Sequence, residues 1–143
     1  MIVKKDLVGN SKIDILQKIA NIAQDEGVVD NSRLYLKGLL ERENKFSTGI
    51  TNGIAIPHCR CEAAKEVSII ICTLKNKVNW ESIDGQDVDF IIALAIPNKD
   101  LDNKYLQIIS KLARNLMKED FVKELKSLDD EEKIINKIKS TIN

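Results

Sequence analysis

The chain has 143 residues, of which 43% are hydrophobic and 31% are charged, a balance typical of a globular protein rather than a disordered one. The 22 Lys and Arg residues equal the 22 Asp and Glu residues, and only 4% of the chain is aromatic, so we expect no nucleic-acid-binding surface. The first residues, MIVKKDLVGN, lack the features of a secretion signal, and no apolar run reaches the length of a membrane span. We therefore expect a cytoplasmic protein without direct membrane insertion, with a single domain over residues 1–143.

Two helices are predicted in the first third of the chain. Ser11 can cap a helix over residues 12–26, in which isoleucine and alanine recur on one stripe at helical spacing. A second helix is predicted over residues 33–43, with Asn31 or Ser32 as its N-cap and leucines on its inner side. Both helices are amphipathic, so each is expected to pack one face against a core.

Three strands are predicted in the middle of the chain. Residues 53–56 (GIAI) form a short strand that must end at Pro57, because proline has no backbone N–H and restricts the residue before it. Residues 67–74 (VSIIICTL) and 88–96 (VDFIIALAI) are apolar on both faces. This pattern is typical of strands covered by helices on both sides of a sheet.

The rest of the chain is predicted to be mostly helical. The sequence around Trp80 predicts a short connecting strand between the two longer ones. Apolar residues then keep helical spacing over residues 105–116, 121–128 and 134–142. Helices before and after a central group of strands predict an α/β fold, with helices on both faces of the sheet.

The only histidine of the chain, His58, follows Pro57 at the end of a predicted strand. Strand ends are where α/β sheets commonly place ligand-binding and catalytic groups. Imidazole titrates near neutrality, so much of it has a free nitrogen lone pair at cellular pH, which suits reversible attack on phosphorus or an acyl carbon. The alternative is a structural histidine on the surface or in a hydrogen bond, the commoner role of a lone histidine.

Three cysteines, Cys59, Cys61 and Cys72, suggest other kinds of site. A metal site with His58 is disfavoured, because adjacent residues rarely converge on one tetrahedral ion and a second Cys-x₂-Cys pair is missing. A cysteine nucleophile with His58 as its base lacks an evident third, orienting group. A metal-binding or redox module therefore ranks last, and an ATP site is not expected because the glycines of TGITNG lack Walker-A spacing.

Residues 39–58, LLERENKFSTGITNGIAIPH, resemble the signature of enzyme IIA of the bacterial phosphoenolpyruvate-dependent sugar phosphotransferase system, fructose/mannitol type. The pattern is a helix that ends in Arg-Glu, followed by Ser-Thr-Gly and then by a Gly-Ile-Ala-Ile-Pro-His strand. The similarity continues through VNWESIDGQDVDFIIALAIP and YLQIISKLARNL and covers nearly the whole chain. This resemblance implies a three-layer α/β/α domain with a mixed central β-sheet, which agrees with the predicted order of elements.

The resemblance also implies a reaction and its partners. Family members carry a phosphoryl group on the histidine of the motif, here His58, which receives it from the histidine-containing phosphocarrier protein. The group then passes to a IIB component and, through it, to a sugar entering by the IIC membrane permease. No metal or other cofactor is implied, because the group moves between nucleophiles of similar transfer potential. A nitrogen-type branch of the family instead signals through its phosphorylation state, and the sequence leaves this alternative open.

Three further site residues are expected beside His58. Arg42 matches the family's arginine just before the signature and would offset the charge of the phosphoryl oxygens. Thr48, with neighbouring backbone amides, would supply neutral donors, although a threonine here is equally well a plain turn residue. Tyr105 stands where many members carry a second histidine, and its hydroxyl is expected to bond either His58 or the phosphoryl group. The alternative is a Tyr105 ring packed on the sheet with its hydroxyl in water.

Overall fold

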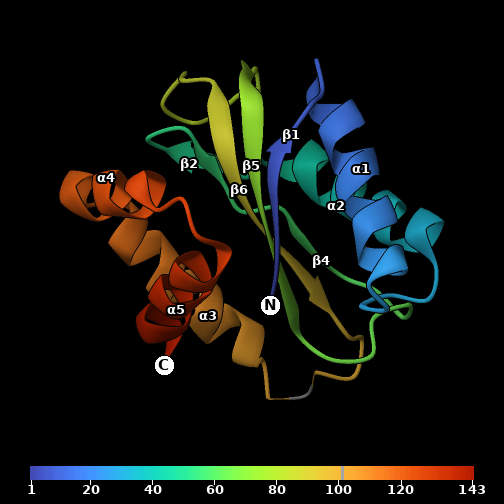
Figure 1. The fold of residues 1–143 in the computed structure, drawn as a ribbon. Coiled ribbons are helices and arrows are strands. Elements are labelled where there is room, and N and C mark those ends of the chain that lie inside the picture. Colours follow the sequence, from blue (N-terminus) through green and yellow to red (C-terminus); the bar gives the residue numbers. More distant parts are fainter. Residues whose placement is uncertain (101) are drawn as a thin grey trace.

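A computed structural model describes residues 1–100 and 102–143, and these residues form a mixed sheet between two groups of helices (Figure 1). The strands are β1 (Ile2–Leu7), β2 (Gly49–Thr51), β3 (Ile54–Ala55), β4 (His58–Arg60), β5 (Ser68–Val78) and β6 (Val88–Ile96). The helices are α1 (Lys12–Asp25), α2 (Ser32–Lys45), α3 (Lys104–Leu116), α4 (Glu119–Ser127) and α5 (Glu131–Ile142). The sheet order is β1-β5-β6-β3-β2, and β4 also pairs with β6.

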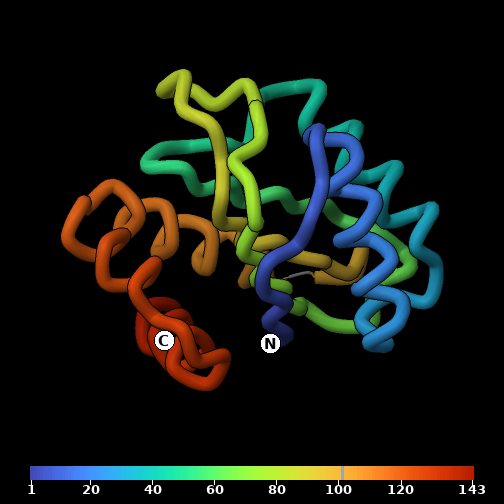
Figure 2. The backbone as a smooth tube through the Cα atoms, turned by 45° about the horizontal axis from the view of Figure 1, so that its top comes forward, coloured from blue at the N-terminus to red at the C-terminus, as the bar shows by residue number. Residues whose placement is uncertain are grey.

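The helices lie on the two faces of this sheet, with α1 and α2 on one side and α3, α4 and α5 on the other (Figures 1 and 2). Side chains alternate between the faces along a strand, so β5 contributes to both cores. Ile70 and Cys72 pack under α1 and α2, whereas Ile69 and Ile71 pack against the C-terminal helices. The antiparallel pair β5–β6 and the parallel pairs β1–β5 and β6–β4 make the sheet mixed. The expected three-layer α/β/α fold is confirmed.

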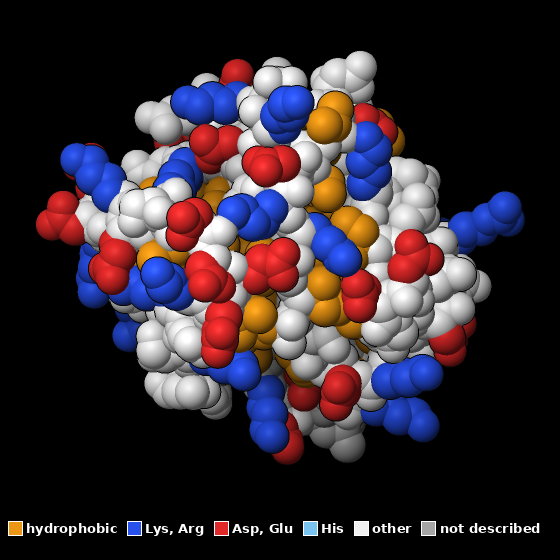
Figure 3. Space-filling view, in the orientation of Figure 1, with side chains coloured by type: hydrophobic (Ala, Val, Ile, Leu, Met, Phe, Trp, Pro, Cys, Tyr) orange, Lys and Arg blue, Asp and Glu red, His pale blue; other side chains and the backbone are white. Residues whose placement is uncertain are grey.

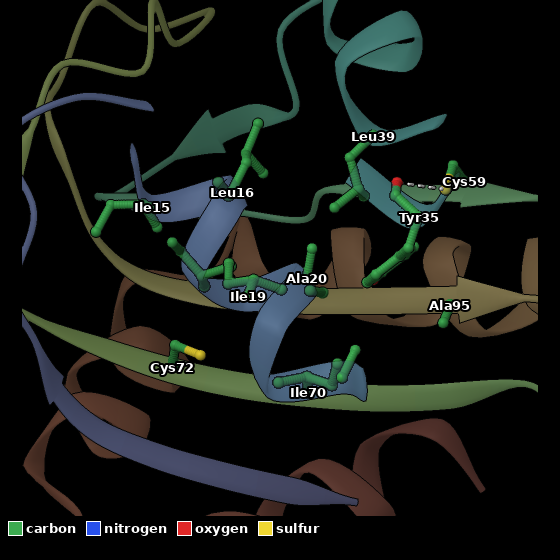
Figure 4. Packing of buried hydrophobic residues seen from close by; sticks show 14 of the residues in the cluster. Ile15, Leu16, Ile19, Ala20, Tyr35, Leu39, Cys59, Ile70, Cys72 and Ala95 are labelled. Atoms are coloured by element: carbon green, nitrogen blue, oxygen red, sulfur yellow. Dashed lines mark hydrogen bonds between the residues drawn. The ribbon is translucent and has the colours of Figure 1, made fainter. Parts of the chain in front are cut away.

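The core under α1 and α2 is built from apolar residues at helical spacing (Figure 4). Ser11 begins α1 as predicted, because its hydroxyl oxygen accepts a bond of 3.1 Å from the amide of Asp14. Ile15 and Ile19 are fully buried against the sheet, and each such burial stabilises the fold by about 1.5–3 kcal/mol. Tyr35 of α2 is also fully buried, with its hydroxyl donating to the backbone oxygen of Leu94 at 3.0 Å.

The strand before the histidine ends ahead of Pro57, as expected, but a new strand, β4, begins directly after the proline at His58. Ile54 pairs with Phe90 in β3, and His58 pairs with Leu94 in β4, so the register against β6 is unchanged across the proline. Pro57 lacks a donor, but its carbonyl oxygen still accepts a bond of 2.9 Å from the amide of Leu94. The proline interrupts the strand without displacing it, and His58 stands at the start of the resumed strand.

Other elements also differ from the sequence predictions; among them, the strand β2 was not predicted and β5 extends to Val78. The segment around Trp80 is not a strand, because Glu81 has a φ of 56°, in the left-handed region that a strand does not use. The first residues, which drew no prediction, form β1, which pairs in parallel with the central strand β5 through contacts such as Val3 with Ile71. The five helices fall where they were predicted, and α2 extends to Lys45, past its expected end at residue 43.

The surface agrees with the neutral composition. On the face shown in Figure 3, acidic and basic side chains are interspersed, and no single sign of charge gathers over one element. Across residues 1–100 and 102–143, no helix is long and apolar enough to cross a membrane.

Candidate functional site

A pocket of about 420 Å³ lies where α2, β4 and the first turn of α3 meet. His58, Arg42 and Tyr105 all line it, so the fold brings together three of the four residues expected from the sequence. A larger hollow of about 640 Å³ lies between the start of α1, the end of α2 and the residues beside Trp80, and its lining includes neither histidine nor cysteine. We therefore regard the smaller pocket, which holds the single imidazole, as the candidate site.

The geometry of His58 determines which of its nitrogens is free. Its Nδ1 lies 2.9 Å from the backbone oxygen of Ile56. A carbonyl oxygen only accepts, so the bond requires the proton on Nδ1 and leaves the lone pair on Nε2. The ring is half-buried at the edge of the sheet and lines the pocket. The bond therefore leaves Nε2 as the ring atom that is available for nucleophilic attack.

The environment of the ring favours its neutral form. Burial lowers the pKa of the His58 imidazole from its ordinary value of 6.5, and the positive charge of Arg42 lowers this pKa further. The bond to Ile56 and the charge of Glu43 act in the opposite direction but do not reverse the shift. The ring is consequently neutral, and able to act as a nucleophile, at physiological pH.

Titration of the single imidazole should show this shift. We expect the NMR titration of the His58 ring protons to have its midpoint below 6.5 in the folded protein and near 6.5 in urea. Because folding disfavours the protonated ring, the stability that this group contributes is present above the unfolded-state pKa. It is lost as the pH falls through the folded-state pKa. A folded-state midpoint at or above the urea value would contradict this description of the site.

Arg42 supplies a cation to the pocket from the last turn of α2. Its Nη1 donates to the backbone oxygen of Phe46 at 2.8 Å, which satisfies a carbonyl just past the end of the helix. A guanidinium has five N–H donors in a planar fork, so this contact leaves others for a ligand. The helix terminus thus fixes a positive charge beside the imidazole.

Thr48 lies outside the pocket, which corrects the expectation that it supplies a neutral donor there. It is buried, with 3% of its surface exposed, and its hydroxyl bonds to the Glu43 carboxylate. Its amide donates to the same carboxylate at 3.1 Å, and the indole N–H of Trp80 donates to its hydroxyl oxygen at 3.1 Å. The Thr48 hydroxyl is therefore engaged in the protein interior.

Glu43 is the buried centre of this network and was not expected from the sequence. Besides Thr48, it pairs with the ammonium group of Lys12 at 3.3 Å. The backbone oxygen of Thr48 accepts from the amide of Ile56 at 2.9 Å, and the oxygen of Ile56 in turn binds His58. Glu43 thus anchors the segment that holds the imidazole. The sequence did contain a sign that Glu43 faces inward, because it lies four residues after Leu39, on the buried side of α2.

Replacing Glu43 with Gln should destabilise the protein while preserving its shape. Each oxygen of the Glu43 carboxylate accepts two hydrogen bonds. The amide of glutamine replaces one of these oxygens with an NH₂ donor, so at least one buried donor loses its acceptor, at a cost of about 1–3 kcal/mol. Urea unfolding followed by the fluorescence of Trp80, the single tryptophan, measures this loss. Glu41→Gln removes an exposed carboxylate from the same helix and is the matched control. Equal stability of the two variants would show that the network contributes nothing.

Tyr105 lines the pocket, and within residues 1–100 and 102–143 no hydrogen bond joins its hydroxyl to His58, so of its two expected partners only a phosphoryl group remains. Instead, the guanidinium of Arg60 lies over the Tyr105 ring, 5.2 Å from its centroid. Arg60 also lines the pocket and was missed in the sequence. Arg60 could have been predicted only if a strand had been expected to start at His58. Residues two apart in a strand lie on the same face, so Arg60 would then have been placed beside His58.

The three cysteines are free thiols in the protein interior. Burial raises the pKa of Cys59 and that of Cys72 to about 12, so both remain protonated and weakly nucleophilic at neutral pH. Within residues 1–100 and 102–143, no three or more His, Cys, Asp or Glu residues are grouped so that they could hold a metal ion. The charged and titratable groups available in the pocket are therefore the imidazole, its neighbouring cations, the Glu41 carboxylate and the Tyr105 hydroxyl.

The family described as "Phosphoenolpyruvate-dependent sugar phosphotransferase system, EIIA 2" matches residues 2–141 of the chain. The chain belongs to this family. It is 28% identical to the PTS system fructose-like EIIA component of Escherichia coli, over 89% of this chain and 85% of that protein. It is 29% identical to the fructose-specific EIIABC component of Bacillus subtilis, over 94% of this chain and 21% of that protein. The chain spans only about a fifth of this longer relative.

Regulatory proteins are also among the relatives of this EIIA chain. It is 31% identical to the nitrogen regulatory protein of Pseudomonas aeruginosa, over 83% of this chain and 77% of that protein. The nitrogen regulatory protein IIA-Ntr of Neisseria meningitidis has the same fold, with a TM-score of 0.85, 23% identity, and coverage of 96% and 92% of the two chains. The mannitol IIA structure of Escherichia coli also shares the fold, with a TM-score of 0.76, 19% identity, and coverage of 95% and 94%.

Proposed function

We propose that this EIIA protein is a phosphoryl carrier that accepts the group on Nε2 of His58 from the histidine-containing phosphocarrier protein. It then passes the group to a IIB component, which phosphorylates a sugar entering through the IIC permease, so the exchange takes place in the cytoplasm. The observation that carries this proposal is the bond between Nδ1 of His58 and the Ile56 oxygen, which directs the free lone pair of the ring away from the backbone.

The proposed step is a displacement at phosphorus between two imidazoles. The Nε2 lone pair of His58 forms a new P–N bond while the P–N bond of the donor histidine breaks, and the donor ring leaves with the bonding electrons. The proton on Nδ1 of His58 stays in its bond to the Ile56 oxygen, and the dipole of that carbonyl stabilises the positive charge that develops on the ring. In this proposal Arg42 binds the phosphoryl oxygens, while Thr48 acts only through the Glu43 network.

The relatives support the choice of partner. One solved structure with the same fold is the complex of mannitol enzyme IIA with phosphorylated enzyme IIB of Escherichia coli, with a TM-score of 0.78, 16% identity, and coverage of 96% and 94%. The Bacillus subtilis relative is an EIIABC component, in which a IIA part accompanies IIB and IIC parts in one protein. A IIB protein is thus the natural acceptor to test.

The second candidate is a regulatory IIA protein that signals by its phosphorylation state. The similarity to the nitrogen regulatory proteins, at 31% identity for the Pseudomonas aeruginosa protein, favours it. A regulator should retain its phosphoryl group when IIB proteins are added, whereas a transport subunit should lose it rapidly to its cognate IIB. The two candidates share the His58 chemistry and differ in the acceptor.

One assay tests both candidates. The protein, incubated with phosphoenolpyruvate, enzyme I and the phosphocarrier protein, should take up one phosphate that is labile in acid and stable in base, as a P–N bond is. A panel of IIB proteins is then added, and loss of the label to one of them supports the transport role. Retention against every IIB protein in the panel supports the regulatory role. Failure of the parent protein to take up phosphate overturns both.

A further inference from the structure

The candidate pocket is lined by a second guanidinium, that of Arg60, besides that of Arg42. Arg42 enters from α2, whereas Arg60 stands on β4 two residues after His58. Cys59, which lies between His58 and Arg60 in the strand, is buried in the core under α2. Because side chains alternate along a strand, His58 and Arg60 lie together on the other face of β4. The pocket that holds the imidazole therefore has cations from two different elements.

Arg60 is held in place by neighbours on three sides. Its Nη2 donates to the backbone oxygen of Asp100 at 2.8 Å and to the side-chain oxygen of Asn103 at 2.9 Å. Its guanidinium carbon lies 5.2 Å from the centroid of the Tyr105 ring, within the range of a cation–π contact. Among residues 1–100 and 102–143, its Nη1 and Nε make no hydrogen bond with the protein, so these donors remain for a ligand.

A phosphoryl group on His58 needs charged N–H donors of the kind that a guanidinium supplies. The group brings a charge of about −1.5 to −2 and three acceptor oxygens to the pocket, and a planar guanidinium binds phosphate oxygens in pairs. Arg42 offers one such fork, and its Nη1 is already bonded to Phe46. A second fork from a different element, β4, would supply donors for the phosphoryl oxygens that Arg42 leaves without a partner.

We propose, on the basis of the proposed function, that Arg60 is a second phosphoryl-binding cation and that the Tyr105 ring positions it. Tyr105 then acts through the face of its ring and not through its hydroxyl. This assignment follows from the stacking of Arg60 on the ring and from the lack of a hydrogen bond between Tyr105 and His58, two residues within the described part of the chain.

The proposal is tested with four variants of Arg60 and Tyr105 and with one control variant. Arg60→Ala should still take up phosphate on His58 but should do so roughly 10–100-fold more slowly, as expected for one lost charge-assisted contact. Arg60→Lys should recover part of the loss, because it keeps the charge and loses the fork. Tyr105→Leu should slow uptake, whereas Tyr105→Phe, which keeps the ring face, should match the parent. Arg114→Ala, in the last turn of α3, is the control for net charge and should also match the parent.

A second readout separates binding of the phosphoryl group from docking of a partner. In the isolated phosphorylated protein, loss of Arg60 should raise the pKa of the phosphoryl group, followed by its ³¹P resonance, because a nearby cation favours the dianion. An unchanged ³¹P titration in Arg60→Ala would overturn the proposal, even with slower uptake, since Arg60 would then act on the partner. Equal losses in the Phe and Leu variants of Tyr105 would also overturn it, by assigning the hydroxyl. Failure of the proposed function itself would look different, because the parent would take up no phosphate.

Discussion

Replacing His58 with Ala should abolish phosphate uptake from the phosphorylated phosphocarrier protein. The side chain is the only imidazole in the chain, and the adjacent thiol of Cys59, whose pKa is raised to about 12 by burial, is a poor substitute at neutral pH. The expected result is no acid-labile label in the variant, measured with radioactive phosphoenolpyruvate. The fold should survive, because His58 is half-buried at the edge of the sheet and makes one hydrogen bond, to Ile56.

Two controls show whether the loss of uptake in His58→Ala is specific to the imidazole: a second variant with a nearby substitution, and a measurement of whether His58→Ala is folded. Cys61→Ala changes a nearby buried residue outside the pocket lining and should retain uptake. The unfolding transition of His58→Ala, followed by Trp80 fluorescence, should show a folded protein. Uptake by His58→Ala at the parent rate would end the assignment of His58, and label on Cys59 would move the acceptor by one residue.

The second large effect is expected at Arg42. Removing its guanidinium takes away the cation that we propose to bind the phosphoryl oxygens during transfer, and such a loss is worth about 2–4 kcal/mol, or roughly 10²–10³ in rate. Arg42→Ala should therefore slow uptake in rapid-quench experiments far more than it lowers stability, since among residues 1–100 and 102–143 its side chain makes one hydrogen bond, to Phe46. Arg42→Lys should recover part of the rate.

Arg42 also acts on the ring itself, and this gives a control. Its positive charge lowers the pKa of His58, so Arg42→Ala should raise the midpoint of the His58 titration towards the ordinary value. A variant with the parent's uptake rate would show that Arg42 only caps the end of α2 through Phe46. If Arg42 acts on both the phosphoryl group and the ring, Arg42→Ala should take up phosphate more slowly and should also have a higher midpoint in the His58 titration.

The elements that sequence reasoning placed correctly are those with a local signal. α1 has a serine cap and a strict apolar stripe, and β6 is a continuous apolar run bounded by Pro97, so their limits agree with the structure. The strand β1 was missed because it has mixed charged and apolar residues, and its pairing with β5 joins residues far apart in the chain. Periodicity within a short window cannot reveal such a partner.

The same distinction explains the site. His58 and Arg42 were found because they belong to one motif, and the fold places both in one pocket. Thr48 belongs to the motif as well, but its hydroxyl faces Glu43, a contact that depends on how the end of α2 meets the following loop. Arg60 escaped notice because Pro57 was expected to end the strand, and without a resumed strand there was no alternation to relate it to His58.

The most direct test of the central claim is to identify the phosphorylated atom by NMR. In protein labelled with ¹⁵N-histidine and phosphorylated through the phosphocarrier protein, the single imidazole should show ³¹P coupling to Nε2. Its Nδ1 should retain the proton bonded to Ile56. A phosphoryl group on Nδ1, or one bonded to sulfur, would contradict the account, because the structure commits Nδ1 to a backbone oxygen and leaves Nε2 as the nucleophile.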